Sequence, residues 1–356
     1  MPTPVCRLYG QNDIRIETHD VGEPGFGEVR VAMAAGGICG SDLHYFQDGG
    51  FGPIRVREPI ILGHEASGTV KALGEGVNEL SVGDRVAINP SRPCGSCRYC
   101  REELTTHCLK MRFNGSALRF PHEQGLFRGE MVVDAGQCIP FGPKTSFSEA
   151  ACAEPLAVCL HARNMAGPLA GKRVMVTGAG PIGALCTALA AEDGADEIVV
   201  TDLQDLPLEV ARKMGATQTI NVSDEPATLD QYAADKGHFD IVFECSAAAP
   251  AIRGAIAAIR PQGRMVQVGV AGETPLPLNA LVGKELNLQG TQRFLAADFT
   301  EAVQLISDLR IDVRPIITGR YPLGQAEKAF RVAGDRSAAV KVQILFDEAE
   351  NFASVT

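Results

Sequence analysis

Two patterns of hydrophobic positions follow one another along the chain. Over the first 150 residues, short runs rich in β-branched residues are separated by glycine and proline, as at residues 28–32, 67–71 and 84–88. Runs of this length between turn residues predict an irregular β domain.

From residue 172 onward, strand-like segments alternate with helix-like segments. Alternation of this kind predicts parallel βαβ units and a doubly wound sheet. The expected strands are residues 172–177, 197–202, 239–244 and 263–268, and the expected helices are residues 181–193, 208–214 and 251–259. A further helix is expected around residues 299–308 and a last strand at residues 340–346.

The two patterns predict an α/β protein of two domains. Its 356 residues exceed the roughly 250–300 that one hydrophobic core usually supports. We expect the first domain to span residues 1–158 and the second to span residues 159–290, with residues 291–356 returning to the first domain.

Charge and hydropathy exclude two classes of partner. The chain has 33 Lys and Arg against 43 Asp and Glu, a formal net charge of -10, and no basic run of the kind that binds nucleic acid. Residues 174–191 are uncharged, but the glycines and the proline within them favour a buried strand, turn and helix over a membrane span. We therefore expect neither nucleic acid nor membrane as a partner.

The chain contains eleven cysteines, which is an odd number. Its first ten residues, MPTPVCRLYG, lack the apolar segment of a secretion signal. Cytoplasmic thiols that stay reduced, some of them bound to a metal, explain this content better than disulfide bonds do.

Four of the cysteines, Cys94, Cys97, Cys100 and Cys108, have the spacing C-x2-C-x2-C-x7-C. Thiolates spaced this closely surround one tetrahedral Zn2+ with little chain strain, and four protein ligands leave no open coordination position. The pattern predicts a structural zinc lobe at about residues 90–110. The alternatives are buried free cysteines and a nucleic-acid-binding zinc ribbon, which the acidic chain disfavours.

The motif Gly178-Ala-Gly180-Pro-Ile-Gly183 follows an expected strand and opens an expected helix. There the first glycine allows a tight turn, the second lets the backbone approach a pyrophosphate, and the third packs helix on strand. The N-terminus of the helix, with Pro181 and Ile182, then presents its partial positive charge to the phosphates. A glycine turn that binds no dinucleotide is the alternative.

Asp202 ends the next expected strand, about 20 residues further on, where an acidic side chain accepts hydrogen bonds from the ribose hydroxyls. A carboxylate there repels the 2'-phosphate of NADP. Leu203, Gln204 and Leu206, which follow it, supply no compensating positive charge. NAD is therefore expected in preference to NADP.

Three further fragments are ordinary when taken singly. They are Cys-Gly-Ser-Asp-Leu-His at residues 39–44, Gly-His-Glu at residues 63–65 and Glu-Pro at residues 154–155. A lone buried cysteine or histidine is more often an inert core residue than a ligand. Spacing alone does not join these fragments into one site.

Together with the four cysteines and the glycine motif, these fragments resemble the zinc-dependent medium-chain dehydrogenases, in particular the polyol branch that includes sorbitol dehydrogenase. The resemblance covers almost the whole chain and rests on the order and separation of these motifs. It implies a GroES-like β catalytic domain and a Rossmann cofactor domain. It also implies an oxidoreductase that uses NAD, one catalytic zinc and one structural zinc.

The resemblance assigns the catalytic metal to particular residues. Cys39, His64 and Glu154 correspond to its ligands, and Glu65 corresponds to a residue that holds the zinc-bound water or enters the shell itself. Three protein ligands and an exchangeable water are the arrangement of a catalytic zinc. Such a zinc polarises the substrate oxygen as a Lewis acid.

Further roles are implied around the metal. Ser41 and His44 correspond to a relay that carries the proton of the substrate hydroxyl toward the nicotinamide ribose and solvent. Val268, Val270 and Arg293 correspond to residues at the nicotinamide, and Arg293 meets the substrate as well.

Several motifs resemble one subfamily, the L-idonate 5-dehydrogenases, which interconvert L-idonate and 5-keto-D-gluconate. They lie at residues 37–45, 86–90, 111–113, 115–117 and 120–122. Phe294 follows Arg293 where sorbitol dehydrogenases have an Arg-Tyr pair, which suits a change of substrate.

A sugar acid brings a carboxylate, for which the forked donors of arginine are the best partner. We expect Arg293 to bind it, and Tyr45, Arg112, Arg119 and His122 to wall the pocket. A solvated surface charge is the alternative for Arg112 and Arg119.

Other functions remain open at this point. They are a polyol dehydrogenase of the sorbitol or xylitol type, a zinc-free quinone reductase of the same fold, and a non-enzymatic zinc-ribbon protein. The resemblance implies a homo-dimer or homo-tetramer.

Overall fold

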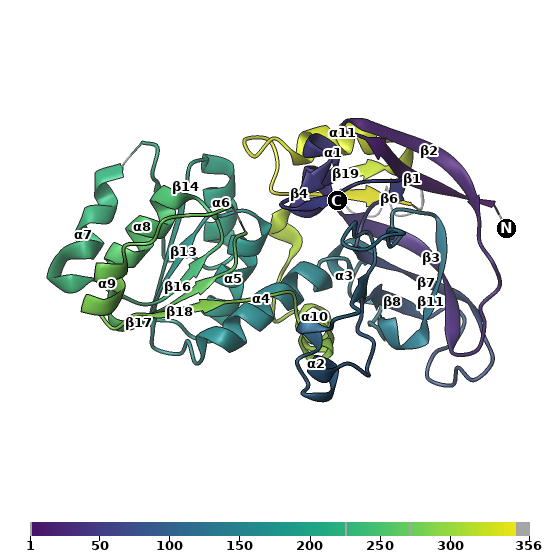
Figure 1. Ribbon diagram of the computed structural model, residues 1–356, viewed down its shortest axis with the longest axis horizontal. Helices are drawn as coiled ribbons and strands as arrows, with labels where there is room; N and C mark the ends of the chain where they lie inside the picture. The colour runs from purple at the N-terminus through teal and green to yellow at the C-terminus, as the bar shows by residue number, and fades with distance from the viewer. Residues whose placement is uncertain (1, 225, 271, 347–356) are drawn as a thin grey trace.

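The computed structural model describes residues 2–224, 226–270 and 272–346, which form two halves placed side by side (Figure 1). One half is built on a seven-stranded sheet and the other on a six-stranded parallel sheet. The purple N-terminal and yellow C-terminal segments belong to the first half, and the green middle of the chain belongs to the second.

The first half consists mainly of short strands. They are β1 (Pro2–Gly10), β2 (Asp13–Asp20), β3 (Glu28–Gly37), β4 (Gly50–Phe51), β5 (Ile54–Arg55), β6 (Ile60–Ile61), β7 (Glu65–Leu73), β8 (Arg85–Ile88), β9 (Ser91–Arg92), β10 (Arg112–Phe113), β11 (Glu130–Asp134), β12 (Cys138–Pro140), β19 (Ile317–Pro322) and β20 (Lys341–Leu345). The main sheet has the order β12-β8-β7-β3-β20-β19, and β11 also pairs with β3. The irregular β domain expected from the hydrophobic pattern is confirmed.

Short helices connect these strands. They are α1 (Gly40–Asp48), α2 (Arg98–Arg101), α3 (Phe147–Ala150) and α11 (Ala326–Ala333), with 3-10 turns at Thr105–His107, Ala135–Gln137, Arg314–Ile316 and Leu323–Gln325. Phe46 of α1 and Phe330 of α11 are buried against each other, with ring centroids 5.2 Å apart. The first helix of the chain and the last are therefore held together by one core.

The second half is a doubly wound parallel sheet. Its strands are β13 (Arg173–Thr177), β14 (Glu197–Asp202), β15 (Gln218–Asn221), β16 (Phe239–Glu244), β17 (Ile259–Gln267) and β18 (Asn287–Gly290), in the order β15-β14-β13-β16-β17-β18. The chain adds β14 and β15 on one side of β13 and then returns to add β16, β17 and β18 on its other side, so the order of connection reverses between β13 and β16. Ligands of such sheets bind at this reversal, outside the carboxyl ends of the strands.

Helices accompany the parallel strands. They are α4 (Ala153–Ala166), α5 (Pro181–Glu192), α6 (Asp205–Lys213), α7 (Asp230–Ala233), α8 (Ala249–Ala258), α9 (Leu278–Gly283) and α10 (Ala296–Ser307), with 3-10 turns at Pro226–Leu229 and Ala234–Lys236. The α6 helix begins three residues before the expected position, and Pro207 lies in its first turn. A proline is tolerated there because the N–H that it lacks would have no partner within the helix.

The uncharged stretch at residues 174–191 forms most of β13, the glycine turn and most of α5. Within the described ranges, no helix is both long and apolar enough to cross a membrane.

Two contacts bring the end of the chain back to its beginning. The β20 strand pairs antiparallel with β3, with Gln343 opposite Gly37. The α10 helix packs on α4, where His161 Nδ1 lies 2.9 Å from Asp298 Oδ2 and both side chains are buried. Residue 158 lies within α4 and residue 290 ends β18. The domain boundaries expected at these two residues stay a prediction.

Candidate active site

The residue before α1 carries the first candidate metal ligand. The backbone N–H of Cys39 donates to Asp42 Oδ2 at 3.1 Å. Asp42 Oδ1 accepts from the backbone N–H of Gly63, also at 3.1 Å, and the Asp42 side chain is fully buried. One carboxylate therefore ties Cys39 to the turn that presents His64.

Cys39, His64 and Glu65 come together in space. Cys39 Sγ, a ring nitrogen of His64 and a carboxylate oxygen of Glu65 lie within 4.8 Å of one another. Both oxygens of Glu65 accept from Lys341 Nζ, at 2.7 and 2.8 Å, and both side chains are buried. Lys341 thus balances the charge of Glu65 and holds this carboxylate beside the other two groups.

Glu154, the third implied ligand, lies on α4. It is outside the group of three, but with His64 it lines a cavity of about 310 Å³. Burial raises the pKa of Glu154 to about 7, the nearby charge of Glu65 adds to the rise, and His64 opposes it. A cation at this place would stabilise the ionised carboxylate.

The side chains present fit a zinc ion. A thiol, an imidazole and a carboxylate are the sulfur, nitrogen and oxygen donors that zinc accepts, and three protein ligands leave a position for substrate. Negative charge also surrounds His64, because Asp42, Cys39 and Glu154 each act on it electrostatically. A divalent cation neutralises such a concentration of negative charge.

Ser41 and His44 lie on the same helix at different depths. Ser41 lines the cavity. The His44 side chain is 49% exposed, and its Nδ1 lies 2.9 Å from Asp48 Oδ2. The two residues therefore lead from the cavity toward solvent, as a proton relay requires.

Arg293 and Tyr45 line the cavity together with the metal group. The Arg293 Cζ lies 5.3 Å from the centroid of the Phe113 ring, and its backbone φ of 53° places it in the left-handed region. Burial lowers the pKa of Arg293 below its ordinary value, whereas Glu154 raises it. The Tyr45 hydroxyl accepts from the backbone N–H of Ala117 at 3.2 Å.

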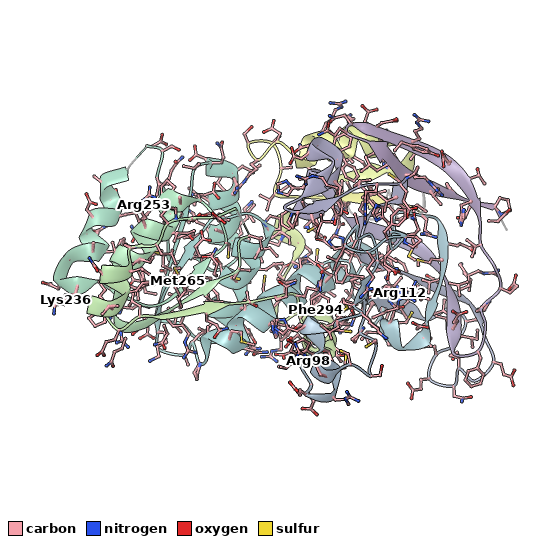
Figure 2. All side chains as sticks on the ribbon, viewed as in Figure 1. Arg98, Arg112, Lys236, Arg253, Met265 and Phe294 are labelled. Atoms are coloured by element: carbon pink, nitrogen blue, oxygen red, sulfur yellow. The ribbon has the colours of Figure 1, made fainter. Side chains whose placement is uncertain are left out.

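Arg112, Arg119 and His122 do not belong to the described residues that line the cavity. Arg112 is exposed on the first half of the molecule (Figure 2) and donates to Glu123 at 2.6 Å. Arg119 donates to two backbone carbonyl groups, and His122 Nε2 accepts from the backbone N–H of Arg57. Contacts with neighbouring segments occupy these groups, so the expectation that they wall the pocket is corrected.

The glycine motif forms the expected turn between β13 and α5. Gly178 has a φ of 84°, which favours glycine. A Cβ on Gly183 would lie 1.8 Å from the Gly178 oxygen, so no other residue allows the helix to pack this closely on the strand. Gly180 caps α5, and Pro181 and Ile182 open its first turn. These are the features that a dinucleotide pyrophosphate needs, and the turn fits that cofactor.

Val268 and Val270 follow β17 and line the same cavity as His64. Thr291, Gln292 and Arg293 join them directly after β18. The cavity therefore lies between the catalytic group of the first half and the carboxyl ends of the parallel strands. A nicotinamide ring held at these strand ends would meet a substrate bound at the metal.

Asp202 ends β14 as expected, but its surroundings differ from the expectation. Its Oδ2 accepts from Arg336 Nη2 at 2.8 Å. The premise that no arginine or lysine compensates its charge is therefore wrong. The three residues after Asp202 are indeed uncharged, and the cation comes from a segment 134 positions away in the sequence.

The four cysteines of the zinc lobe meet around α2. Their Sγ atoms all lie within 4.8 Å of one another. Backbone N–H groups of Ser96 and Cys97 lower the pKa of Cys94 to about 6, and those of Cys100 and Leu109 lower the pKa of Cys97. Four thiols in one cluster, with amides that favour the thiolate form of Cys94 and Cys97, fit a structural zinc ion.

The sequence interpretation missed the roles of three residues. Asp42 stands inside the Ser-Asp-Leu-His run, where a buried carboxylate beside two ligands is a readable signal. Lys341 opens a strand of apolar residues, and a charge in such a strand usually has a buried partner. Arg336 gave no signal, because only the fold brings it to Asp202.

Comparisons with known families agree with this architecture. Residues 25–143 match the alcohol dehydrogenase GroES-like domain, and residues 181–308 match the zinc-binding dehydrogenase domain. The chain is 39% identical over 345 residues to L-idonate 5-dehydrogenase (NAD(P)(+)) of Escherichia coli, which covers 97% of this chain and 99% of that protein.

Two further similarities support the same family. Sorbitol dehydrogenase 1 of Saccharomyces cerevisiae is 35% identical over 338 residues, covering 92% of this chain and 93% of that protein. The crystal structure of the Escherichia coli L-idonate 5-dehydrogenase superposes with a TM-score of 0.91 and covers 97% of this chain and 99% of its own. The expected GroES-like and Rossmann architecture is confirmed.

Proposed function

Because the chain belongs to the zinc-dependent alcohol dehydrogenase family, in its polyol branch, we propose that it oxidises L-idonate to 5-keto-D-gluconate with NAD. Arg293 carries this proposal. It is the one lysine or arginine among the described residues that line the cavity. A guanidinium next to the reacting centre can bind the carboxylate of a sugar acid by forked hydrogen bonds. Sorbitol dehydrogenases have an arginine at this position too, so the preference for L-idonate over a neutral polyol rests also on the higher identity to L-idonate 5-dehydrogenase, 39% against 35% for sorbitol dehydrogenase 1.

Cys39, His64 and Glu154 are the proposed ligands of the catalytic zinc. When bound, zinc supplies a Lewis acid for the substrate hydroxyl, and the nicotinamide supplies the hydride acceptor. In the proposed relay, Ser41, which lines the cavity, would accept the hydroxyl proton while donating its own toward the nicotinamide ribose, and His44 would pass a proton from the ribose to solvent. Glu65 stays beside the ligands because Lys341 holds both of its oxygens.

The packing around Arg293 supports its role as an anchor. Its guanidinium faces the Phe113 ring, and a contact of this kind holds a planar cation in a fixed orientation. The cavity also places Tyr45 and Ser116 beside it, and both carry hydroxyl groups able to bond the hydroxyls of a sugar. We propose that the substrate carboxylate binds Arg293 while its secondary alcohol lies at Ser41 and His64.

The proposal is tested by kcat/KM for L-idonate and for sorbitol in the wild type and in Arg293→Ala. The wild type should prefer L-idonate, and the variant should lose about 10- to 100-fold more on L-idonate than on sorbitol, as expected for one charged hydrogen bond. Arg112→Ala is the matched control, because Arg112 lies outside the cavity and pairs with Glu123. A wild type that turns over sorbitol or xylitol faster than L-idonate would instead support the polyol alternative.

A homo-oligomer also stays a proposal. The β18 strand forms one edge of the six-stranded sheet, and all four of its residues are exposed. Val282 and Leu278, close to it in the chain, are 78% and 67% exposed. An exposed edge with apolar side chains near it favours pairing with a second copy. Sedimentation equilibrium would give the mass, and a monomer at micromolar concentration would refute the proposal.

A further inference from the structure

A buried carboxylate joins the helix that carries Glu154 to the helix that follows Arg293. Asp298, in the first turn of α10, is 4% exposed, and His161 of α4 is 6% exposed. Asp298 Oδ2 lies 2.9 Å from His161 Nδ1, and the ring nitrogen is the donor because an ionised carboxylate only accepts. Asp298 Oδ1 accepts from Asn164 Nδ2, also at 2.9 Å. Two donors on α4 therefore bind one group on α10, and the two helices lie against each other (Figure 1).

The same carboxylate fixes the point where α10 begins. Leu295, the residue before the helix, donates its backbone N–H to Asp298 Oδ2 at 2.8 Å. A bond from this amide to the side chain at the third helical position is one half of a capping box. Phe294 is buried, and the centroid of its ring lies 5.8 Å from that of Phe299. The turn just after Arg293 is therefore held on both its polar and its apolar side.

Arg293 has a backbone conformation that needs such support. Its φ of 53° lies in the left-handed region, which is unfavourable for a residue with a Cβ and persists only where the surrounding structure holds it. Arg293 lies two positions before Leu295, so the bond from Leu295 to Asp298 limits how far this turn can relax. Relaxation to an ordinary φ would move the guanidinium away from the Phe113 ring that it faces.

The other side of the contact leads to the metal group. Glu154, Val158 and His161 follow one another on α4 at spacings of four and three residues, so they share one face of the helix. Glu154 and Val158 line the cavity, and His161 continues the same face toward α10. Glu154 also acts electrostatically on Arg293 and raises the pKa of its guanidinium. This face of α4 therefore carries a candidate metal ligand at one end and the partner of Asp298 at the other.

We propose that His161 and Asp298 are positioning residues that set the distance between the metal ligand Glu154 and the substrate anchor Arg293. The pair thereby maintains the preference for a substrate that carries a carboxylate. This inference rests on the dehydrogenase function proposed above. Neither side chain of the pair is among the described residues that line the cavity, so the pair acts through Glu154 and Arg293.

A second ion pair between the same helices offers a comparison. Arg163 Nη2 of α4 donates to Glu301 Oε1 of α10 at 2.7 Å, and these side chains are 22% and 43% exposed. Glu301 lies one turn further into α10 than Asp298, away from Arg293. Removal of either contact should weaken the packing of α4 on α10. Only removal of the buried contact should displace Arg293.

The test measures kcat/KM for L-idonate and for sorbitol, at saturating NAD, in the wild type, Asp298→Ala and His161→Leu. In both variants the ratio of the two values should fall about tenfold, and the loss should lie in KM for L-idonate rather than in kcat. Asp298→Asn and His161→Asn keep a polar atom near the original one and should restore most of the ratio. Glu301→Gln is the matched control and should leave the ratio within about twofold of the wild type.

A double-mutant cycle shows whether the effect runs through Arg293. In the Arg293→Ala protein, the further change Asp298→Ala should lower the ratio by less than about twofold, because the anchor is already absent. A further tenfold loss would overturn the inference, and so would equal losses on both substrates in Asp298→Ala and His161→Leu, because a purely structural role lowers both. His161→Leu leaves the Leu295 cap in place and decides the question if Asp298→Ala does not fold.

Backbone hydrogen exchange gives a second readout that needs no substrate. Exchange at the start of α10 should be faster in Asp298→Ala and in His161→Leu, and should stay as in the wild type in Glu301→Gln. If Arg293→Ala leaves the ratio of the two substrates unchanged, the sugar-acid proposal fails, and exchange alone then decides the inference. Faster exchange would support the positioning role, whereas wild-type exchange in both variants would overturn it.

Discussion

The two candidate metal sites of this protein are built in opposite ways. The lobe draws its four thiols from one short segment, Cys94 to Cys108, and closes the coordination shell with them. The candidate catalytic site would draw Cys39 from the residue before α1, His64 from the turn before β7 and, as proposed, Glu154 from α4. The residues of the first site lie within one short segment, whereas those of the second come together only when the whole chain is folded.

The two candidate metal sites also differ in how deeply their side chains are buried and in which groups balance their charge. Three of the four cysteines of the lobe are partly exposed, and backbone amides favour the thiolate form of two of them, Cys94 and Cys97, whereas burial raises the pKa of Cys100 to about 12. At the catalytic site His64, Glu65 and Glu154 are buried, and Lys341 pairs with Glu65. We therefore expect changes at the lobe to act mainly on stability and changes at the catalytic site to act mainly on turnover.

The largest effect is expected from His64→Ala. Removal of a ligand weakens the zinc that stabilises the developing negative charge, a contribution of several kcal/mol. At 1.36 kcal/mol per factor of ten, kcat should fall about 1,000-fold or more. NAD affinity, measured by calorimetry, should change little, because the glycine turn is separate. An active, zinc-free His64→Ala protein would contradict the proposed mechanism.

Cys97→Ser changes the four-cysteine lobe and should lower stability rather than turnover. A tetrahedral shell with one thiolate missing binds zinc much more weakly, and the folding free energy that the metal supplies is lost with it. The melting temperature should fall by roughly 5 °C or more, while kcat of the protein that remains folded stays within about tenfold of the wild type. Unchanged melting and unchanged metal content would show that the lobe binds no structural zinc.

A smaller effect is expected from Asp42→Ala. Asp42 contacts no metal position directly, but its two oxygens bond the N–H groups of Cys39 and Gly63. Loss of a group that orients metal ligands typically costs about 10- to 100-fold in metal affinity or activity. Asp42→Asn, which can keep one of the two bonds, should lie between Asp42→Ala and the wild type. Zinc titration against a chelator measures both, and equal affinities in all three proteins would contradict this role.

The smallest effect is expected from His44→Ala. His44 is half exposed at the outer end of the proposed relay, where water can replace it. Turnover should fall about 2- to 20-fold, and its pH profile should shift, whereas zinc content stays unchanged. The profile of kcat against pH separates this role from a structural one, since a purely structural loss would lower the curve without moving it.

Features formed by one short segment could be predicted from the sequence, whereas features assembled from distant segments could not. Four of the six strands of the parallel sheet were predicted, three of them nearly to the residue, since these buried strands contain continuous hydrophobic runs, as Glu197–Asp202 does. The short edge strands β15 and β18 were not predicted, and β17 begins four residues before its expected start. The four cysteines were assigned from spacing alone, because their ligand geometry is local. The fragments around Cys39, His64 and Glu154 could be joined only through the family resemblance.

The sequence could not predict contacts between segments that lie far apart along the chain. Arg112 and Arg119 were expected at the pocket because they follow the lobe in the chain, but Glu123 and nearby carbonyl groups hold them elsewhere. The charge at Asp202 was considered unopposed because the residues next to it are neutral, yet Arg336 is bound to it. Local sequence shows which groups a segment carries, and only the fold shows which groups they meet.

The zinc content of three proteins tests the central claim most directly. Elemental analysis should find about two zinc ions per chain in the wild type and about one in each of Cys97→Ser and His64→Ala. Turnover should be lost in His64→Ala alone, and melting should be lowered mainly in Cys97→Ser. Two zinc ions in either variant, or turnover lost equally in both, would contradict the account of one local structural site and one assembled catalytic site.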